Sequence, residues 1–292
     1  MKKAINGKKF DWPSFLIVTL LCCWGLIVLY PFYNSVLISL VTSETYSKTP
    51  FLLFPPKIDF SAYQIVFAWK GIVSGFKTTF IILVFGVAYN LFLTISTAYA
   101  LTKPMPGRKF FNYMIIFTMY FSGGLIPYYL LVSQSLHLRD QYASMILPVG
   151  IHIMYMMIMQ SYFRTIPLEI EESAKLDGAN DLVILFKIIL PLSLPMLATI
   201  TLYYAVDRWN EWWNGMLFIR SVGKMPLQLH IRNIIQSSQV ITESIPESLQ
   251  PTTFAMGIQM ATVMTSIIPI TLMYPFLQKY FVKGLTLGSV KS

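Results

Sequence analysis

The residues best suited to chemistry are acidic, and they are concentrated in one segment of the chain. Of the 13 Asp and Glu residues, five lie close together: Glu169, Glu171, Glu172, Asp177 and Asp181. Neighbouring carboxylates can form an acid–base pair, but they also stabilise the positive end of a helix. Helix-end electrostatics explain them better here, because Pro167 suits the first turn of a helix and the three Glu residues follow it. The segment interrupts an otherwise apolar sequence, so we expect something in the aqueous phase to bind it.

No motif indicates an enzyme. His137, His152 and His230 are widely separated, and neither an HExxH nor a GxSxG motif occurs. The adjacent Cys22 and Cys23 match neither a disulfide nor the spacing of metal ligands. A phosphate-binding GxxxxGK[ST] loop is also missing from the sequence, so the chain is not itself an ATPase. We expect no catalytic residue, no cofactor and no metal on this chain.

The composition predicts an all-α integral membrane protein. Hydrophobic residues make up 55% of the 292 positions and charged residues 12%, with a mean hydropathy of +0.59, whereas soluble domains carry about 25% charged residues. Because a span needs about 20 apolar residues, the chain is predicted to be one transmembrane domain over 1–292 with six helices. These helices are expected at Phe15–Leu37, Phe80–Leu101, Tyr113–Leu131, Ser144–Tyr162, Pro195–Met216 and Phe254–Phe276.

Basic residues suggest the orientation. The net charge of +9 comes from Lys and Arg residues at the ends of apolar runs rather than in a stripe, which favours membrane topology over nucleic-acid binding. A cytoplasmic N-terminus, with Lys2, Lys3, Lys8 and Lys9, places most of the 22 Lys and Arg residues inside. Six crossings would then put both termini and the acidic segment in the cytoplasm. Two longer segments, about 41–79 and 207–253, would lie outside.

The elements that position the acidic residues are predicted to be two short helices joined by a turn. The first should end near Leu176, with Gly178 as its stop signal. Asn180 or Asp181 can cap the second helix, and Pro191 marks its junction with the fifth span. This arrangement predicts a helix pair that protrudes from the membrane.

The same segment carries a spaced motif. It reads Glu172-Ser173-Ala174, three residues, Gly178, nine residues, Ile188, one residue, Leu190-Pro191. The motif resembles the EAA loop of permease subunits of ABC importers, and it departs from that pattern only at Ser173, where alanine is usual. The strings DGAN at 177–180, LPLSLP at 190–195 and QKYFVKGLTLGSVK at 278–291 resemble the carbohydrate branch of the family. Similarity extends over essentially the whole chain and is greatest to the maltose-type second permease and the complex-oligosaccharide group.

The resemblance implies a type I, MetI-like importer fold in a bacterial inner membrane, with a cytoplasmic coupling loop at about 164–191. A coupling helix would dock on one of two ATPase subunits, which bind ATP and Mg. An external solute-binding protein would deliver an oligosaccharide, and a second permease subunit would complete the pathway. The residues expected to couple the permease to the ATPase are Glu171, Glu172, Ser173, Ala174, Asp177, Gly178, Ala179, Ile188, Leu190 and Pro191.

The competing hypothesis is a self-contained, ion-coupled secondary sugar transporter. Such a protein needs ionisable residues within its spans, where we find His152 but no carboxylate pair. Asp207 and Glu211 lie near an external helix end. A lone histidine is more often packed than part of a proton relay, so this hypothesis is the weaker one.

The substrate path is the least determined feature. Tyr203, Tyr204, Trp209 and Trp212 cluster in the sequence near the external end of the fifth span, where aromatic rings can stack on sugars. Trp and Tyr are also enriched at membrane interfaces as anchors, which is the favoured interpretation. The sequence leaves open whether the cargo is neutral or bears uronates.

Overall fold

The computed structural model describes residues 12–49, 53–236 and 254–289, with the backbone alone beyond residue 272. Within these ranges every regular secondary-structure element is a helix. Some of the sequence features discussed above lie outside the described residues: the four N-terminal lysines, residues 237–253 of the second external segment, and residues 290 and 291 of the C-terminal string.

Three described helices are long and apolar enough to cross a membrane. They are α1 (Trp12–Ser39), α4 (Lys70–Ala100) and the first part of α16 (Ala255–Ser289). Two bent pairs also qualify if each pair counts as one span: α5 (Arg108–Tyr120) with Leu125–Ser135, bent by 108°, and Asp181–Leu192 with Leu194–Phe218, bent by 86°. The described residues therefore hold three to five candidate spans, and the count of six stays a prediction.

Three of the predicted spans are interrupted. The expected helix Pro195–Met216 breaks between α12 (Leu194–Trp209) and α13 (Trp213–Phe218). The expected helix Tyr113–Leu131 breaks between α5 and α6 (Leu125–Leu130), where Gly124 has a φ of 88° that side-chain-bearing residues rarely adopt. The expected helix Ser144–Tyr162 is divided into α7 (Ala143–Ile146) and α8 (Ile153–Phe163). Pro148 lies in the gap between them and has no N–H to continue the helix. Apolar composition predicted these segments as spans but did not predict the breaks.

The described residues form two compact units by internal contacts, within 1–68 and 237–265 and within 69–236 and 266–292. The first includes α1, α2 (Ser43–Lys48), α3 (Ser61–Ala68) and the start of α16. Tyr46 of α2 stacks on Phe254 with ring centroids 5.0 Å apart. Most side chains of α1 are exposed and apolar, which suits contact with lipid or another subunit.

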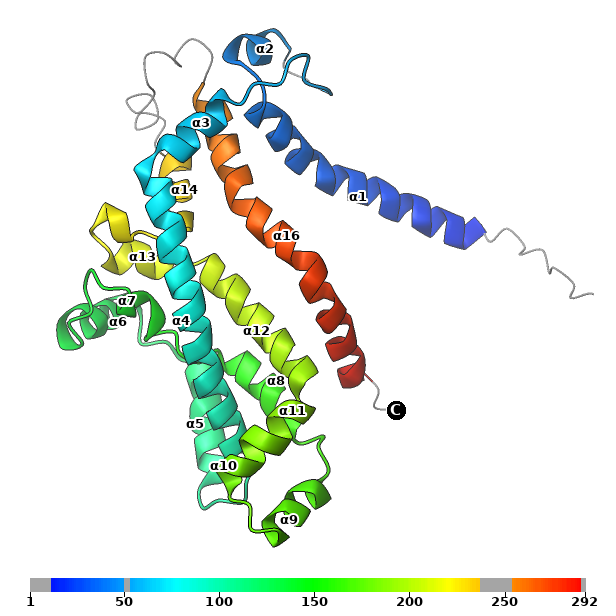
Figure 1. Cartoon of the computed structure of the whole chain (residues 1–292), viewed down its shortest axis with the longest axis vertical. Helices are drawn as coiled ribbons and strands as arrows, with labels where there is room; N and C mark the ends of the chain where they lie inside the picture. The colour runs from blue at the N-terminus through cyan, green and yellow to red at the C-terminus, as the bar shows by residue number, and fades with distance from the viewer. Residues whose placement is uncertain (1–11, 50–52, 237–253, 290–292) are drawn as a thin grey trace, which may run out of the picture. The chain divides into compact units, whose positions relative to one another are not determined.

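The second unit is built on α4, which packs against α8 and α12 (Leu194–Trp209) (Figure 1). Its core contains the fully buried side chains of Met156, Met159, Ile184 and Ile200. At one end of this unit lie α9 (Leu168–Leu176), α10 (Asp181–Ile184), the π-helix η2 (Leu185–Ile189) and α11 (Leu190–Leu192). The remaining helices are η1 (Leu131–Ser135), α13 (Trp213–Phe218), η3 (Val222–Lys224) and α14 (Leu227–Gln236).

Close packing of α14 on α4 depends on small residues. A Cβ at Gly75 would lie 2.9 Å from the ring of His230 and 3.1 Å from the backbone of Leu227. A Cβ at Gly71 would lie 3.3 Å from the same ring. The two glycines therefore leave space for the buried side chain of His230 within this unit.

Candidate functional site

The predicted helix–turn–helix is present. Helix α9 follows Pro167 and ends at Leu176, as the sequence predicted. Gly178 has a φ of 84°, and the N–H of Ala179 donates to the carbonyl of Ala174 at 2.9 Å, which closes the helix end. Asn180 caps α10 by accepting the N–H of Val183 at 2.9 Å.

Helix α9 has two unlike faces. On the inner face Ala174 is buried against the core of the second unit, and the Glu171 carboxylate accepts a hydrogen bond from Lys103. On the outer face Glu172 and Ser173 are exposed, and the Leu176 side chain is 90% exposed. A helix that buries one small residue and exposes a leucine is arranged to be covered by another surface.

Lys103 connects α9 to the end of α4. The side chains of the Lys103–Glu171 ion pair are only 17% and 16% exposed, and the Lys103 ammonium lies 4.1 Å from the centre of the Tyr99 ring. Burial lowers the pKa of Lys103, but the hydrogen bonds to Glu171 and Tyr99 outweigh it and raise that pKa overall. Lys103 was not predicted as a coupling residue, because a single lysine after a span resembles any topology signal.

The other residues of the motif occupy different environments. Asp177 is exposed and Ala179 half-buried. Ile188 in η2 and Leu190 in α11 pack on the core shortly before the bend between α11 and α12, whereas Pro191 is exposed. The terminal part of the motif therefore shapes this bend, and the outward surface is made by α9.

The four predicted substrate-path residues are not gathered into one patch. Tyr203 and Tyr204 both contact Tyr155, with ring centroids 5.2 Å and 5.0 Å away. Tyr204 is buried, shares a 2.6 Å hydrogen bond with Thr94 and accepts the N–H of His152 at 3.0 Å. Trp209 and Trp212 lie beside other partners: Phe76 at 6.3 Å and the Arg232 guanidinium at 3.9 Å, respectively.

Arg208 is a buried charged residue that was not predicted from the sequence. Its side chain is 3% exposed, and its guanidinium donates to the Asn90 side chain at 2.8 Å and to three backbone carbonyls at 2.6–3.2 Å: Met145, Ile146 and Val149. Asn90 in turn donates to the carbonyls of Val149 and Gly150. These bonds hold the segment between α7 and α8 in place. They attach it to α4 through Asn90 and to α12 through Arg208. An arginine near a span end looks like an interfacial residue in the sequence, so nothing there identifies it.

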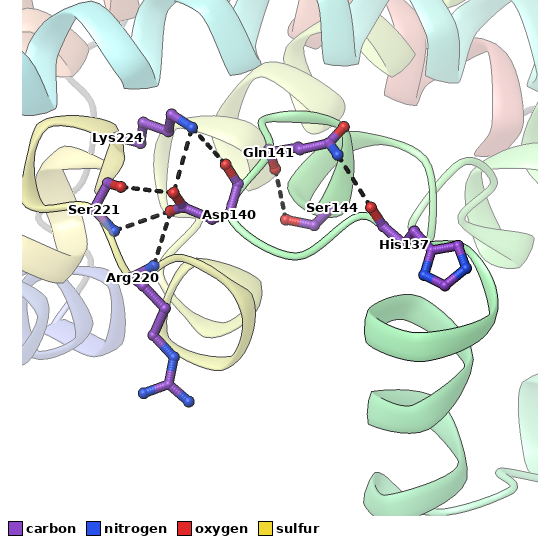
Figure 2. Close-up of polar contacts among 7 residues, drawn as sticks. All are labelled: His137, Asp140, Gln141, Ser144, Arg220, Ser221 and Lys224. Atoms are coloured by element: carbon purple, nitrogen blue, oxygen red, sulfur yellow. Dashed lines mark hydrogen bonds and ion pairs between the residues drawn. The ribbon is translucent and has the colours of Figure 1, made fainter.

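A second polar junction surrounds Asp140, as Figure 2 shows. The Asp140 carboxylate accepts the backbone N–H groups of Arg220 and Ser221 at 3.0 Å and 2.9 Å and the Ser221 hydroxyl at 2.6 Å. The ammonium of Lys224 donates to the Asp140 carbonyl at 2.6 Å. The hydroxyl and backbone hydrogen bonds of Ser221 hold the pKa of Asp140 far below its usual range. The junction ties the loop before α7 to the segment after α13.

Comparison with known proteins identifies the family. Over 290 residues the chain is 39% identical to the polygalacturonan/rhamnogalacturonan transport system permease protein YtcP of Bacillus subtilis (strain 168), covering 98% of this chain and 100% of that protein. It also matches a chain from the crystal structure of a bacterial ABC transporter involved in the import of the acidic polysaccharide alginate, with a TM-score of 0.85, 33% identity and coverage of 96% of this chain and 100% of the other. The chain belongs to the carbohydrate ABC transporter permeases.

A second relative matches most of this permease. The permease is 37% identical over 271 residues to Protein LplC of the same Bacillus strain, covering 91% of this chain and 90% of LplC. No protein-family model matches the permease. YtcP is named as a transport permease and the alginate protein is part of an ABC transporter, so a membrane location follows from the family.

Proposed function

We propose that this permease is one of two transmembrane subunits of a bacterial importer that takes up an oligosaccharide delivered by an external solute-binding protein. The single observation that carries the coupling mechanism is the two-faced α9. Its outer face is free to dock on an ATPase subunit, and its inner face is tied to α4. The relatives named for polygalacturonan/rhamnogalacturonan transport and for alginate import support a carbohydrate cargo.

In this proposal ATP and Mg bind to two separate ATPase subunits. Closure of those subunits displaces α9, whose exposed Leu176 and Glu172 form the docking surface. The Lys103–Glu171 ion pair and the buried Ala174 pass the displacement to α4 and the bundle core. Six spans, with both termini in the cytoplasm of the inner membrane, are the topology expected for this cycle.

The secondary-transporter alternative is not favoured. Among the described residues with known side-chain burial, no Asp or Glu is buried. A proton- or ion-coupled pathway within the spans would need such groups. Energy input from an external ATPase through α9 requires none.

The proposal is tested by purifying the permease with its partners from the native membrane and reconstituting them in liposomes. We expect a second permease and an ATPase to co-purify, and we expect ATP hydrolysis to rise when the sugar-loaded binding protein is added. Glu172→Lys and Gly178→Glu should abolish ATP-driven uptake without loss of insertion, whereas Glu44→Lys, on the exposed surface of α2, should not. Normal uptake in both coupling variants, or transport by the chain alone without ATP, would contradict the proposal.

A further inference from the structure

A polar cavity of about 260 Å³ lies where α12 and the segment between α7 and α8 meet α4. Its polar lining comprises Asn90, His152, Tyr204, Asp207, Arg208 and Glu211. The volume is below that of most drug-sized ligand pockets, but a few convergent polar groups in one cavity are typical of sites that orient a small ligand. None of its lining residues lies in α9, and Trp209 is not among them.

The only guanidinium in the lining is already occupied by the protein. Nε and both terminal nitrogens of Arg208 donate to Asn90 and to backbone carbonyls, and the side chain is 3% exposed. The Asn90 amide likewise donates to two carbonyls. Arg208 therefore shapes the cavity wall but offers little donor capacity to an anionic ligand.

Two carboxylates supply the accessible acceptors. Asp207 is exposed, and Glu211 is half-buried with each oxygen accepting one hydrogen bond from Asn214, at 2.9 Å and 3.0 Å. A carboxylate oxygen has a second lone pair, so Glu211 can still accept from a ligand. Two carboxylates against one guanidinium give the lining a net negative charge.

Two of the lining residues, His152 and Tyr204, carry aromatic rings. Tyr155 is not part of the lining but contacts both rings, with centroids 4.0 Å from the exposed His152 and 5.0 Å from Tyr204. Aromatic faces pack on the apolar C–H face of a sugar ring, while carboxylates accept hydrogen bonds from its hydroxyl groups. Both kinds of group are present here together.

We propose that this cavity binds an uncharged sugar residue of the cargo, with Asp207 and Glu211 accepting hydrogen bonds from its hydroxyl groups. The inference rests on the proposed importer function and narrows its substrate class. A uronate carboxylate placed here would face two like charges, and it would find the guanidinium already bonded. The permease thus selects a neutral ring at this position, whatever groups lie elsewhere in the oligosaccharide.

The test uses the complete importer in lipid nanodiscs without its binding protein, so that the cargo preference of that protein plays no part. Saturation-transfer NMR compares methyl galactoside with methyl galacturonide, which differ only in the carboxylate. We expect the galactoside to bind the unmodified importer more tightly. Its affinity should fall about tenfold in Asp207→Asn and in Glu211→Gln, because each removes a charged acceptor. The control Glu44→Gln removes an exposed carboxylate far from this lining in sequence and should bind as the unmodified protein does.

Three results would overturn the proposal: tighter binding of the galacturonide, galactoside binding unchanged in both cavity variants, or no binding of either sugar. ATP hydrolysis stimulated by the loaded binding protein is measured on the same preparations. If stimulation persists while the sugar result is negative, the cavity assignment fails and the importer function stands. Loss of stimulation in the unmodified complex would instead contradict the importer function.

Discussion

Helix α9 and the Arg208 cluster occupy the same compact unit but are built in opposite ways. Along α9 only Ala174 is buried, and the apolar Leu168 and Leu176 are exposed. Around Arg208 the charged group is buried, and its N–H groups donate to partners within the chain. The Arg208 cluster therefore has its hydrogen-bonding partners within this permease, whereas α9 exposes apolar side chains that another protein can cover.

The largest effect should come from removing the guanidinium of Arg208. Arg208→Met removes the guanidinium donor from the Asn90 oxygen and from the carbonyls of Met145 and Ile146, whereas Val149 keeps its bond from Asn90, and each unmet buried group costs about 1–3 kcal/mol. We expect poor recovery of folded protein and a markedly lower midpoint of thermal unfolding in detergent. Arg208→Lys should rescue little, because a lysine lacks the planar fork of donors.

The matched control for Arg208 is Arg220→Met. The Arg220 guanidinium points away from the Asp140 junction in Figure 2, and only its backbone N–H bonds to Asp140. This variant should unfold close to the temperature of the unmodified protein. Equal stability of the Arg208 and Arg220 variants would show that the buried hydrogen bonds are not what holds the break in place.

The ion pair that joins α9 to the end of α4 is tested by exchanging its two charges. Lys103→Glu and Glu171→Lys should each reduce ATP-driven uptake by about tenfold or more, because each places like charges together in a half-buried pair. The double exchange should restore a substantial part of uptake and of stimulated ATP hydrolysis.

An exposed pair on the same segment provides the comparison. Lys175 and Asp181 are 3.2 Å apart with side chains 51% and 58% exposed, so Lys175→Glu should alter stability little. If the double exchange at Lys103 and Glu171 performs no better than either single variant, the tie between α9 and α4 is not a transmitter of motion.

The docking role of α9 is tested by replacing its exposed leucine, Leu176. Leu176→Asp should weaken binding of the ATPase subunit, measured by co-purification and titration, because interface affinity depends on a few apolar anchors. Thermal stability of the permease should stay unchanged, since the side chain contacts solvent. A drop in stability with unchanged ATPase binding would place Leu176 in internal packing instead.

The smallest effect concerns Asp140 and pH. Because folding lowers the pKa of this carboxyl, the unfolded chain binds more protons, and the stabilisation is present above the ordinary aspartate pKa and is lost as pH falls below it. We expect Asp140→Asn to lower the unfolding midpoint at neutral pH by about 2–4 °C and to reduce the loss seen on acidification. Asp177→Asn, at an exposed carboxylate, is the control. An identical acid response in both variants would remove Asp140 as its source.

Local signals in the sequence predicted much of the coupling segment. Pro167, Gly178 and Asn180 act through their own backbone and cap chemistry, so the bounds of α9 and the cap of α10 were predicted correctly. The EAA-like spacing identified the family before any fold was known. The interrupted spans were not predicted, because hydropathy reports residence in the membrane and is insensitive to a turn at Gly124 or a gap at Pro148.

The sequence by itself determined that this chain is a helical membrane protein with a protruding helix pair, since composition, periodicity and cap residues act within a few positions of one another. Only the tertiary structure decided that Lys103 pairs with Glu171, that Arg208 is buried against carbonyls, and that Asp140 holds residues 220 and 221. These partners are distant in sequence, and lysine, arginine and aspartate at span ends look alike until the fold selects which of them loses contact with water.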